Sequence, residues 1–167
     1  MRKQKGFSLI ELLIVVAIIL IIAAIAIPNL LRARIAANES SAVASVRTTN
    51  TAEITYQTAN PTIGYASMSV LGGSGSPCTL SATAACLIDN TLALGTKSGY
   101  LFVATPQTVG TSVATNALTV STIPQNYNQS GVRAFCSNED AVIRSSNTAT
   151  PTQQTTDAGC AGYTVLQ

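Results

Sequence analysis

The segment KGFSLIELLIVVAIILIIAAIAIPNLLRAR, residues 5–34, dominates this 167-residue sequence. Residues 12–27 form an unbroken apolar run, and the next charged side chain is Arg32. Basic residues stand before the run at Arg2, Lys3 and Lys5. A helix that rises about 1.5 Å per residue crosses the hydrocarbon core of a bilayer over such a length. Basic residues ahead of an apolar stretch of this length predict an export or anchoring signal.

Three interpretations of this N-terminus compete. The small residues of Ala24-Ile25-Ala26 are typical of a secretory signal peptide, but the apolar run is longer than the usual core of roughly 7–15 residues. An ordinary membrane anchor explains the length and leaves Glu11 unexplained. A carboxylate inside a membrane costs roughly 2.5–3.5 kcal/mol on insertion scales unless it has a partner, so Glu11 is a candidate functional residue.

The third interpretation accounts for the acid. Residues 5–11, Lys-Gly-Phe-Ser-Leu-Ile-Glu, resemble the processing site of type IV prepilins: glycine, an aromatic residue and glutamate at fixed offsets before a long apolar run. The resemblance implies that a prepilin peptidase cleaves between Gly6 and Phe7 and that Phe7 is then N-methylated. It also implies that Glu11 pairs with the amine of a neighbouring subunit during assembly. A plain alternative is an acid that complements the helix macrodipole.

The same segment begins a very long predicted helix. No turn signal occurs between Phe7 and Asn60-Pro61 except Pro28, so we expect a leader at 1–6, a helix over 7–59 and a head over 60–167. Residues at about 10–31 are expected to span the membrane and later to form the filament core. Pro28 removes one helical hydrogen bond and predicts a kink or hinge.

Beyond Pro28 the helix becomes amphipathic. The pattern places Leu31, Ile35, Ala42 and Val46 on one face, with Val43 and Ile54 beside it. The charged residues fall mostly elsewhere by this pattern: Arg32, Arg34, Glu39, Arg47 and Glu53. We therefore expect the apolar face to pack on the head.

The sequence of the head predicts a β-rich structure. Four runs of β-branched and aromatic residues are separated by turn residues, at 99–105, 117–123, 131–137 and 141–145. They predict an antiparallel sheet over the helix and hence an α+β, pilin-like architecture. Pro124 lies just past its strand, a short helix is expected around 84–94, and residues 147–167 read as a loop.

The four cysteines allow three disulfide connectivities. An exported head meets an oxidising compartment, which favours disulfides over a metal site. We expect Cys136 to pair with Cys160 and Cys78 to pair with Cys86. The first pair resembles the disulfide that closes the C-terminal loop of type IV pilins.

Composition narrows the function. The sequence contains no histidine, which excludes a Ser-His-Asp triad and any His-ligated metal site. The formal net charge of +2 argues against a broad basic surface for DNA. We expect no enzymatic activity, no cofactor and no metal. A membrane-anchored enzyme or ligand-binding module is the disfavoured alternative.

The resemblance implies a structural subunit that waits in the inner membrane and polymerises into a helical filament at the cell surface. Its implied partners are other subunits, the prepilin peptidase, and an assembly platform with a cytoplasmic ATPase. Adhesion, motility and DNA uptake are the outputs known for the family. A pseudopilin of type II secretion and a minor pilin carry the same N-terminal motif and remain alternatives.

Overall fold

A computed structural model describes residues 7–73, 81–110 and 114–166. The chain divides into two compact units, Met1–Arg34 and Ile35–Gln167, and we describe each by itself. The boundary lies inside one helix, α1 (Leu9–Ala59), so the second unit contains the second half of that helix as well as the predicted head. From here on, the head means this whole unit, Ile35–Gln167. The helix begins two residues after the predicted start and ends immediately before Asn60-Pro61, as the sequence predicted.

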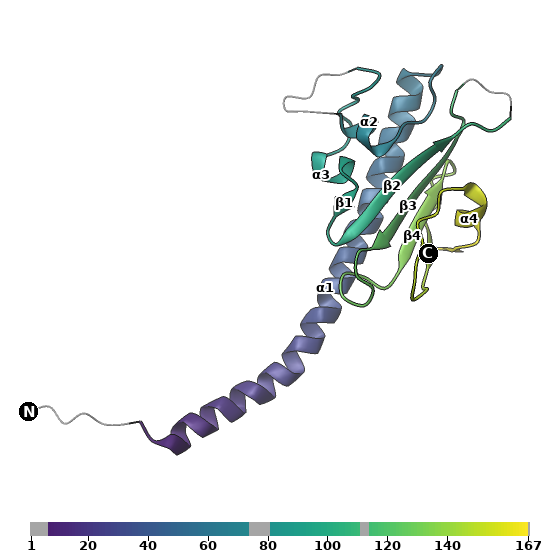
Figure 1. Ribbon diagram of the computed structural model, residues 1–167. Coiled ribbons are helices and arrows are strands. Elements are labelled where there is room, and N and C mark those ends of the chain that lie inside the picture. The colour runs from purple at the N-terminus through teal and green to yellow at the C-terminus, as the bar shows by residue number, and fades with distance from the viewer. Residues whose placement is uncertain (1–6, 74–80, 111–113, 167) are drawn as a thin grey trace, which may run out of the picture. The chain divides into compact units, whose positions relative to one another are not determined.

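The head contains a six-stranded antiparallel sheet in the order β1-β2-β3-β4-β5-β6. The strands are β1 (Thr96–Lys97), β2 (Tyr100–Gln107), β3 (Ala117–Pro124), β4 (Ala134–Asn138), β5 (Arg144–Ser146) and β6 (Thr164–Val165). Each strand pairs with the next along the chain, and the longest ladder joins β2 to β3. In Figure 1, β2, β3 and β4 run beside one another along the second half of α1. The predicted α+β architecture is confirmed.

The prediction of four strands was too low. β1 and β6 have two residues each, which is too short for a sequence period to reveal. Strand β3 also extends one residue further than predicted, because Pro124 is its last residue and pairs with Tyr100.

Two of the predicted strands begin later than expected because side chains capture the preceding backbone. The amides of Val132 and Arg133 donate to Glu39 Oε1 instead of to a neighbouring strand, so β4 starts at Ala134. The amide of Val142 donates to Asp140 Oδ1, and Ala141 has a φ of 57°, so β5 starts at Arg144. Local side-chain bonds of this kind compete with strand pairing.

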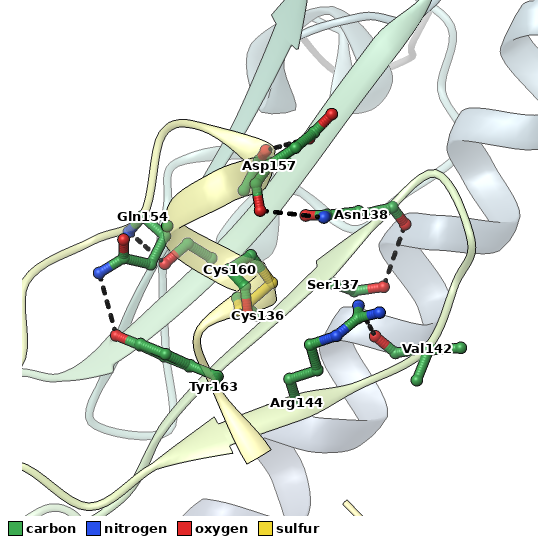
Figure 2. The surroundings of a disulfide bond; sticks show 12 residues. Cys136, Ser137, Asn138, Val142, Arg144, Gln154, Asp157, Cys160 and Tyr163 are labelled. Carbon is green, nitrogen blue, oxygen red and sulfur yellow. Dashed lines mark hydrogen bonds between the residues drawn. A yellow bond between two sulfur atoms is a disulfide. The ribbon is translucent and has the colours of Figure 1, made fainter. Parts of the chain in front are cut away.

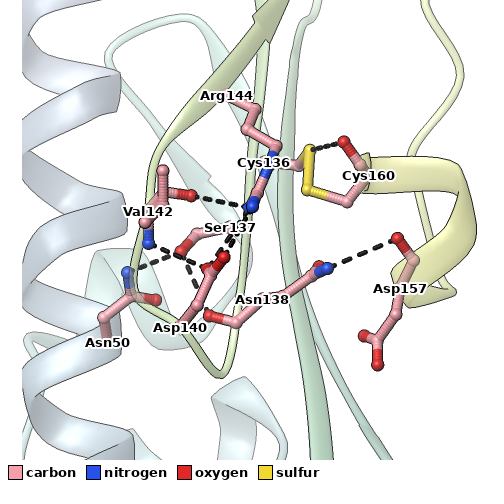
Figure 3. A network of polar contacts seen from close by, with 9 residues as sticks. All are labelled: Asn50, Cys136, Ser137, Asn138, Asp140, Val142, Arg144, Asp157 and Cys160. Carbon is pink, nitrogen blue, oxygen red and sulfur yellow. Dashed lines mark hydrogen bonds and ion pairs between the residues drawn. A yellow bond between two sulfur atoms is a disulfide. The ribbon is translucent and has the colours of Figure 1, made fainter. Parts of the chain in front are cut away.

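The connecting segments carry three short helices, α2 (Met68–Gly72), α3 (Asn90–Ala93) and α4 (Asp157–Ala161). α3 confirms the helix expected around 84–94 but is shorter, because the amides of Ala85 and Leu87 bond to the carbonyls of Val70 and Leu71. α2 was not predicted. The tail expected as a loop also contains α4 and β6, and the sheet lies between α4 and α1 (Figure 3).

The buried face of α1 differs from the predicted apolar stripe. Ala42 and Val46 are fully buried, as expected, and Ile35 is half-buried. Leu31 and Ile54 are exposed, whereas Glu39 and Glu53, expected on other faces, are buried. The face is largely polar, and the sheet and the segment after α1 supply its hydrogen-bond partners. A pattern that scores only hydrophobicity misplaces such a face, because buried polar groups need partners rather than apolar neighbours.

The two buried glutamates differ in their partners. Glu39 accepts two backbone amides and forms an ion pair with Arg133 at 2.8 Å. Glu53 accepts only the amide of Ala66 among the described residues, through Oε2 at 2.9 Å. Burial raises the pKa of Glu53 to about 7, against a usual value of 4.5, and the Ala66 bond offsets only part of that shift.

This contrast predicts opposite effects for two matched variants. Below pH 4.5 Glu53 carries its proton in both the folded and the unfolded chain. Between pH 4.5 and about 7 only the folded chain keeps it, so ionisation lowers the free energy of unfolding by about 3 kcal/mol as pH rises. Glu53→Gln should therefore raise the melting temperature at pH 8 and change it little at pH 4.5, measured on residues 35–167 in metal-free buffer.

Glu39→Gln is the control from the same helix face. It removes a charge-assisted contact to Arg133 and should lower the stability at pH 8 by about 1–3 kcal/mol. Equal destabilisation by both variants would contradict the assignment of Glu53 as a carboxylate without a charged partner.

Candidate functional site

The candidate assembly segment is the start of α1. Phe7 is 80% exposed, and Ser8 stands directly before the first helical residue. The amide of Ser8 donates to Glu11 Oε2 at 2.9 Å. This is one half of a capping box, in which the third helical residue accepts the amide of the cap residue. The pattern S-x-x-E at residues 8–11 is the sequence signal of such a box.

In the single chain, the Glu11 carboxylate accepts the amide of Ser8. It satisfies one amide at the helix start and places a negative charge near the positive end of the macrodipole. The geometry therefore matches the plain helix-terminus interpretation of Glu11 in the uncleaved chain. The interpretation as a contact between subunits stays a prediction.

The first half of α1 presents apolar side chains on every side. The large hydrophobic residues between Leu9 and Leu31 are all exposed within the described chain. By length and composition this part of α1 can cross a membrane. A helix that is apolar all round is stable only where lipid or other protein covers it. This surface is the strongest functional feature of the N-terminal unit.

Pro28 lies inside α1, and the helix continues through it. A proline within a helix still removes one backbone hydrogen bond, so the helix is less stable at this position. Its role as a hinge remains a prediction. Gly6, the residue before the predicted cleavage point, lies outside the described residues.

The Cys136–Cys160 disulfide is confirmed. It joins β4 to α4 over a sequence separation of 24 residues, and both cysteines are fully buried (Figure 2). Cys86 is also disulfide-bonded. Its predicted partner, Cys78, lies outside the described residues, so that pairing stays a prediction.

Hydrogen bonds fix the C-terminal segment around this disulfide. Thr119 Oγ1 donates to Asp157 Oδ1 at 2.9 Å. Asn138 Nδ2 donates to the carbonyl of Asp157 at 3.3 Å (Figures 2 and 3). Gln154 bonds to the Tyr163 hydroxyl on the other side of the disulfide. Hydrogen bonds and the disulfide therefore hold the tail against the sheet, although its sequence is typical of a loop.

A second group of polar contacts closes the turn after β4. Asp140 and Arg144 form an ion pair, and the Arg144 guanidinium also donates to the carbonyl of Val142 (Figure 3). The hydrogen bond from Arg144 is the main reason why the pKa of Asp140 lies below its usual value. These contacts hold the turn between β4 and β5.

Residues with the chemistry of catalysis are sparse. No group of three or more Cys, Asp or Glu side chains comes together as a metal cluster within 7–73, 81–110 and 114–166. A cavity at the end of α1, about 340 Å³, is lined mainly by small and apolar residues beside Tyr56 and Asn60. Neither feature points to a reaction.

Comparisons with known proteins agree with the N-terminal resemblance. A family model described as the prokaryotic N-terminal methylation motif matches residues 1–27. The chain is 68% identical over 40 residues to the type IV wide pilus major component PilA4 of Thermus thermophilus, covering 24% of this chain and 30% of that protein. It is 44% identical over 54 residues to the type IV major pilin protein PilA of Myxococcus xanthus, covering 32% of this chain and 24% of that protein.

These matches are confined to a part of each protein. The matched segments span less than a third of the length of either relative. No solved structure matches the chain. The resemblance of the N-terminal segment to type IV pilins is confirmed, and the head is described by its own structure.

The motif predicts the mature N-terminus. Cleavage after Gly6 should leave a chain that begins with N-methylated Phe7, because the peptidase reads the residues around the glycine. Intact-mass and N-terminal peptide mass spectrometry of exported protein measure this directly. A chain that begins at Ile27, after the alternative site at Ala24-Ile25-Ala26, would show that a signal peptidase acts instead.

The disulfide predicts a loss of stability on its removal. Replacing Cys136 and Cys160 together by alanine should lower the free energy of unfolding by roughly 3–4 kcal/mol, from the loop-closure entropy of a loop of this length. Urea unfolding of residues 35–167 under oxidising conditions measures the change. An unaltered midpoint would mean that the hydrogen bonds of Asp157 and Gln154 hold the tail without the bond.

Proposed function

We propose that this protein is a structural subunit of a type IV pilus, with no enzymatic activity, which polymerises through α1 into a filament at the cell surface. One observation carries the proposal: an exposed apolar helix that starts with a methylation motif and Glu11. The two matched relatives are named as major components of type IV pili. Those names favour a pilus subunit over a pseudopilin of a secretion system.

Assembly follows from the two surroundings that such a helix tolerates. Before assembly, the inner membrane covers the residues between Leu9 and Leu31. In the filament, the same residues pack against the helices of other subunits, while the heads form the outer surface. The apolar surface thus passes from lipid to protein without meeting water, and Pro28 provides a point at which the helix can adjust.

Glu11 sets the position of an incoming subunit relative to its neighbour in the filament. Cleavage after Gly6 creates a positive amine on Phe7, and a carboxylate in an apolar bundle is costly unless it meets an opposite charge. The amine of one subunit and Glu11 of the next satisfy each other. The Ser8 amide occupies Glu11 Oε2, and a carboxylate has a second oxygen that can accept the intersubunit amine.

The proposed partners follow from the same steps. A prepilin peptidase cleaves and methylates the chain, and an assembly platform with a cytoplasmic ATPase extracts it from the membrane. Copies of the chain itself form the filament. The function of the filament in adhesion, motility or DNA uptake depends on the head and on these partners.

The test uses two variants of Glu11. Glu11→Ala removes both the charge and the cap, whereas Glu11→Gln keeps an oxygen that can accept the Ser8 amide and removes only the charge. We expect both variants to insert and to be processed, and both to yield few filaments, because the intersubunit pair is lost. Electron microscopy and the mass of sheared filaments measure the yield, with Ser8→Ala as a control that keeps the carboxylate and the amide.

Normal filament yield from both Glu11 variants would leave only the capping role. Absence of sheared filaments from the unaltered protein, in cells that assemble other pili, would contradict the proposed function itself.

A further inference from the structure

Buried oxygens without a partner occur together in one part of the head. Asn50, Glu53 and Asn138 each hold a side-chain oxygen that accepts no hydrogen bond from the described residues. All three residues line one cavity of about 10 Å³ between α1, β3 and the turn that follows β4. A cavity of this size holds about one water molecule or one ion. The unpartnered atoms of Asn50 and Glu53 are acceptors, so an electropositive occupant matches them.

Asn50 bonds to the sheet through its amide nitrogen. Its Nδ2 donates to Ser137 Oγ at 2.9 Å, and the Ser137 hydroxyl donates its own proton to the carbonyl of Asn138 (Figure 3). In this arrangement the Ser137 hydroxyl accepts from Asn50 and donates to Asn138, so it joins the helix to the end of β4. Asn50 is 6% exposed, so Oδ1 is a buried oxygen left over for the cavity.

Glu53 supplies the second oxygen from one turn further along the same helix. Its Oε2 accepts the amide of Ala66, and its side chain is 0% exposed, which leaves Oε1 for the cavity. Residues three apart lie on one helix face, so both oxygens come from the same side of the cavity.

Glu139 adds a second carboxylate from the turn after β4. It lines the cavity and is exposed, so this side faces solvent. Glu53 and Tyr65 line the same cavity, so both carboxylates border one small space beside the tyrosine ring. The described lining contains no cationic side chain.

Asn138 is not part of this set of ligands. Figure 3 shows its side chain directed toward Asp157 and away from Asn50. Two carboxylates and one amide oxygen therefore remain around a cavity that is large enough for one ion.

We propose that this cavity binds a hard metal cation, with Ca²⁺ as the best match, through Glu53 Oε1, Asn50 Oδ1 and the carboxylate of Glu139. Carboxylate and amide oxygens are typical Ca²⁺ ligands, and Ca²⁺ tolerates irregular geometry, whereas Mg²⁺ demands a near-ideal octahedron. Softer metals prefer sulfur or imidazole ligands, and the described lining has neither. Water from the solvent side completes the shell.

A bound cation joins two elements that are distant in the chain. Asn50 and Glu53 belong to α1, and Glu139 belongs to the turn between β4 and β5. The ion offsets the charge of a buried carboxylate and fastens the turn to the helix. Since it binds the folded chain alone, it stabilises the head by mass action.

Terbium luminescence tests the site on the full chain in micelles of an uncharged detergent at pH 7.5. Tb³⁺ substitutes for Ca²⁺, and Tyr65 in the lining is placed to sensitise its emission. We expect sensitised emission that Ca²⁺ displaces and that Mg²⁺ displaces at least tenfold less well. Ca²⁺ alone should raise the melting temperature of the same sample.

The decisive variant is Glu53→Gln, which is expected to fold because it removes a costly buried charge. It should weaken Tb³⁺ binding at least about tenfold, since the loss of a direct ligand costs no less than the loss of a supporting residue. Glu139→Gln should weaken it as well. Asp89→Asn, at a surface ion pair with Lys97 outside the cavity lining, should leave binding unchanged.

No displaceable emission and no Ca²⁺-dependent shift in melting temperature would overturn the proposal. Equal Tb³⁺ affinity in Glu53→Gln and the unaltered chain would overturn it too, because the ion would then bind elsewhere. Neither result depends on whether the chain forms filaments.

Discussion

Packing of the second half of α1 against the sheet is the interaction on which the rest of the head depends. Ala42 and Val46 meet Phe102, Val120 and Phe135 in one continuous core. The Cys136–Cys160 disulfide holds the tail on the opposite face of the sheet (Figure 3). Without this helix face, the antiparallel sheet would expose its apolar side to water.

The face of α1 is specific because it is polar as well as apolar. Asn38, Glu39, Asn50 and Glu53 each bond to another segment of the head, so the helix has one rotational position that satisfies them together. Apolar contacts alone would tolerate a small rotation, whereas misaligned buried polar groups would each cost free energy. The same requirement brings the oxygens of Asn50 and Glu53 to one cavity.

The first half of α1 has a different constraint. Among residues 7–34 its large apolar side chains are exposed, and this is the physical basis for the proposed filament. A helix of this kind needs an apolar partner or a membrane to cover it. The bond between Ser8 and Glu11 satisfies the end of the helix until such a partner is present.

The sequence by itself determined the elements whose signals are local. The apolar run, the motif at residues 5–11, the stop at Asn60-Pro61 and the four main strands are all visible in neighbouring residues. The sequence also favoured the Cys136–Cys160 pair, through resemblance to pilins.

Only the tertiary structure decided which face of α1 is buried, where β4 and β5 begin, and how the tail folds. Glu39 can be buried because its carboxylate accepts hydrogen bonds from the Arg133 side chain and from two backbone amides, all more than 90 positions away. β1 and β6 exist because longer strands lie beside them. Contacts between distant residues leave no periodic signal in the sequence, since the energy of a buried polar group depends on the partner that the fold supplies.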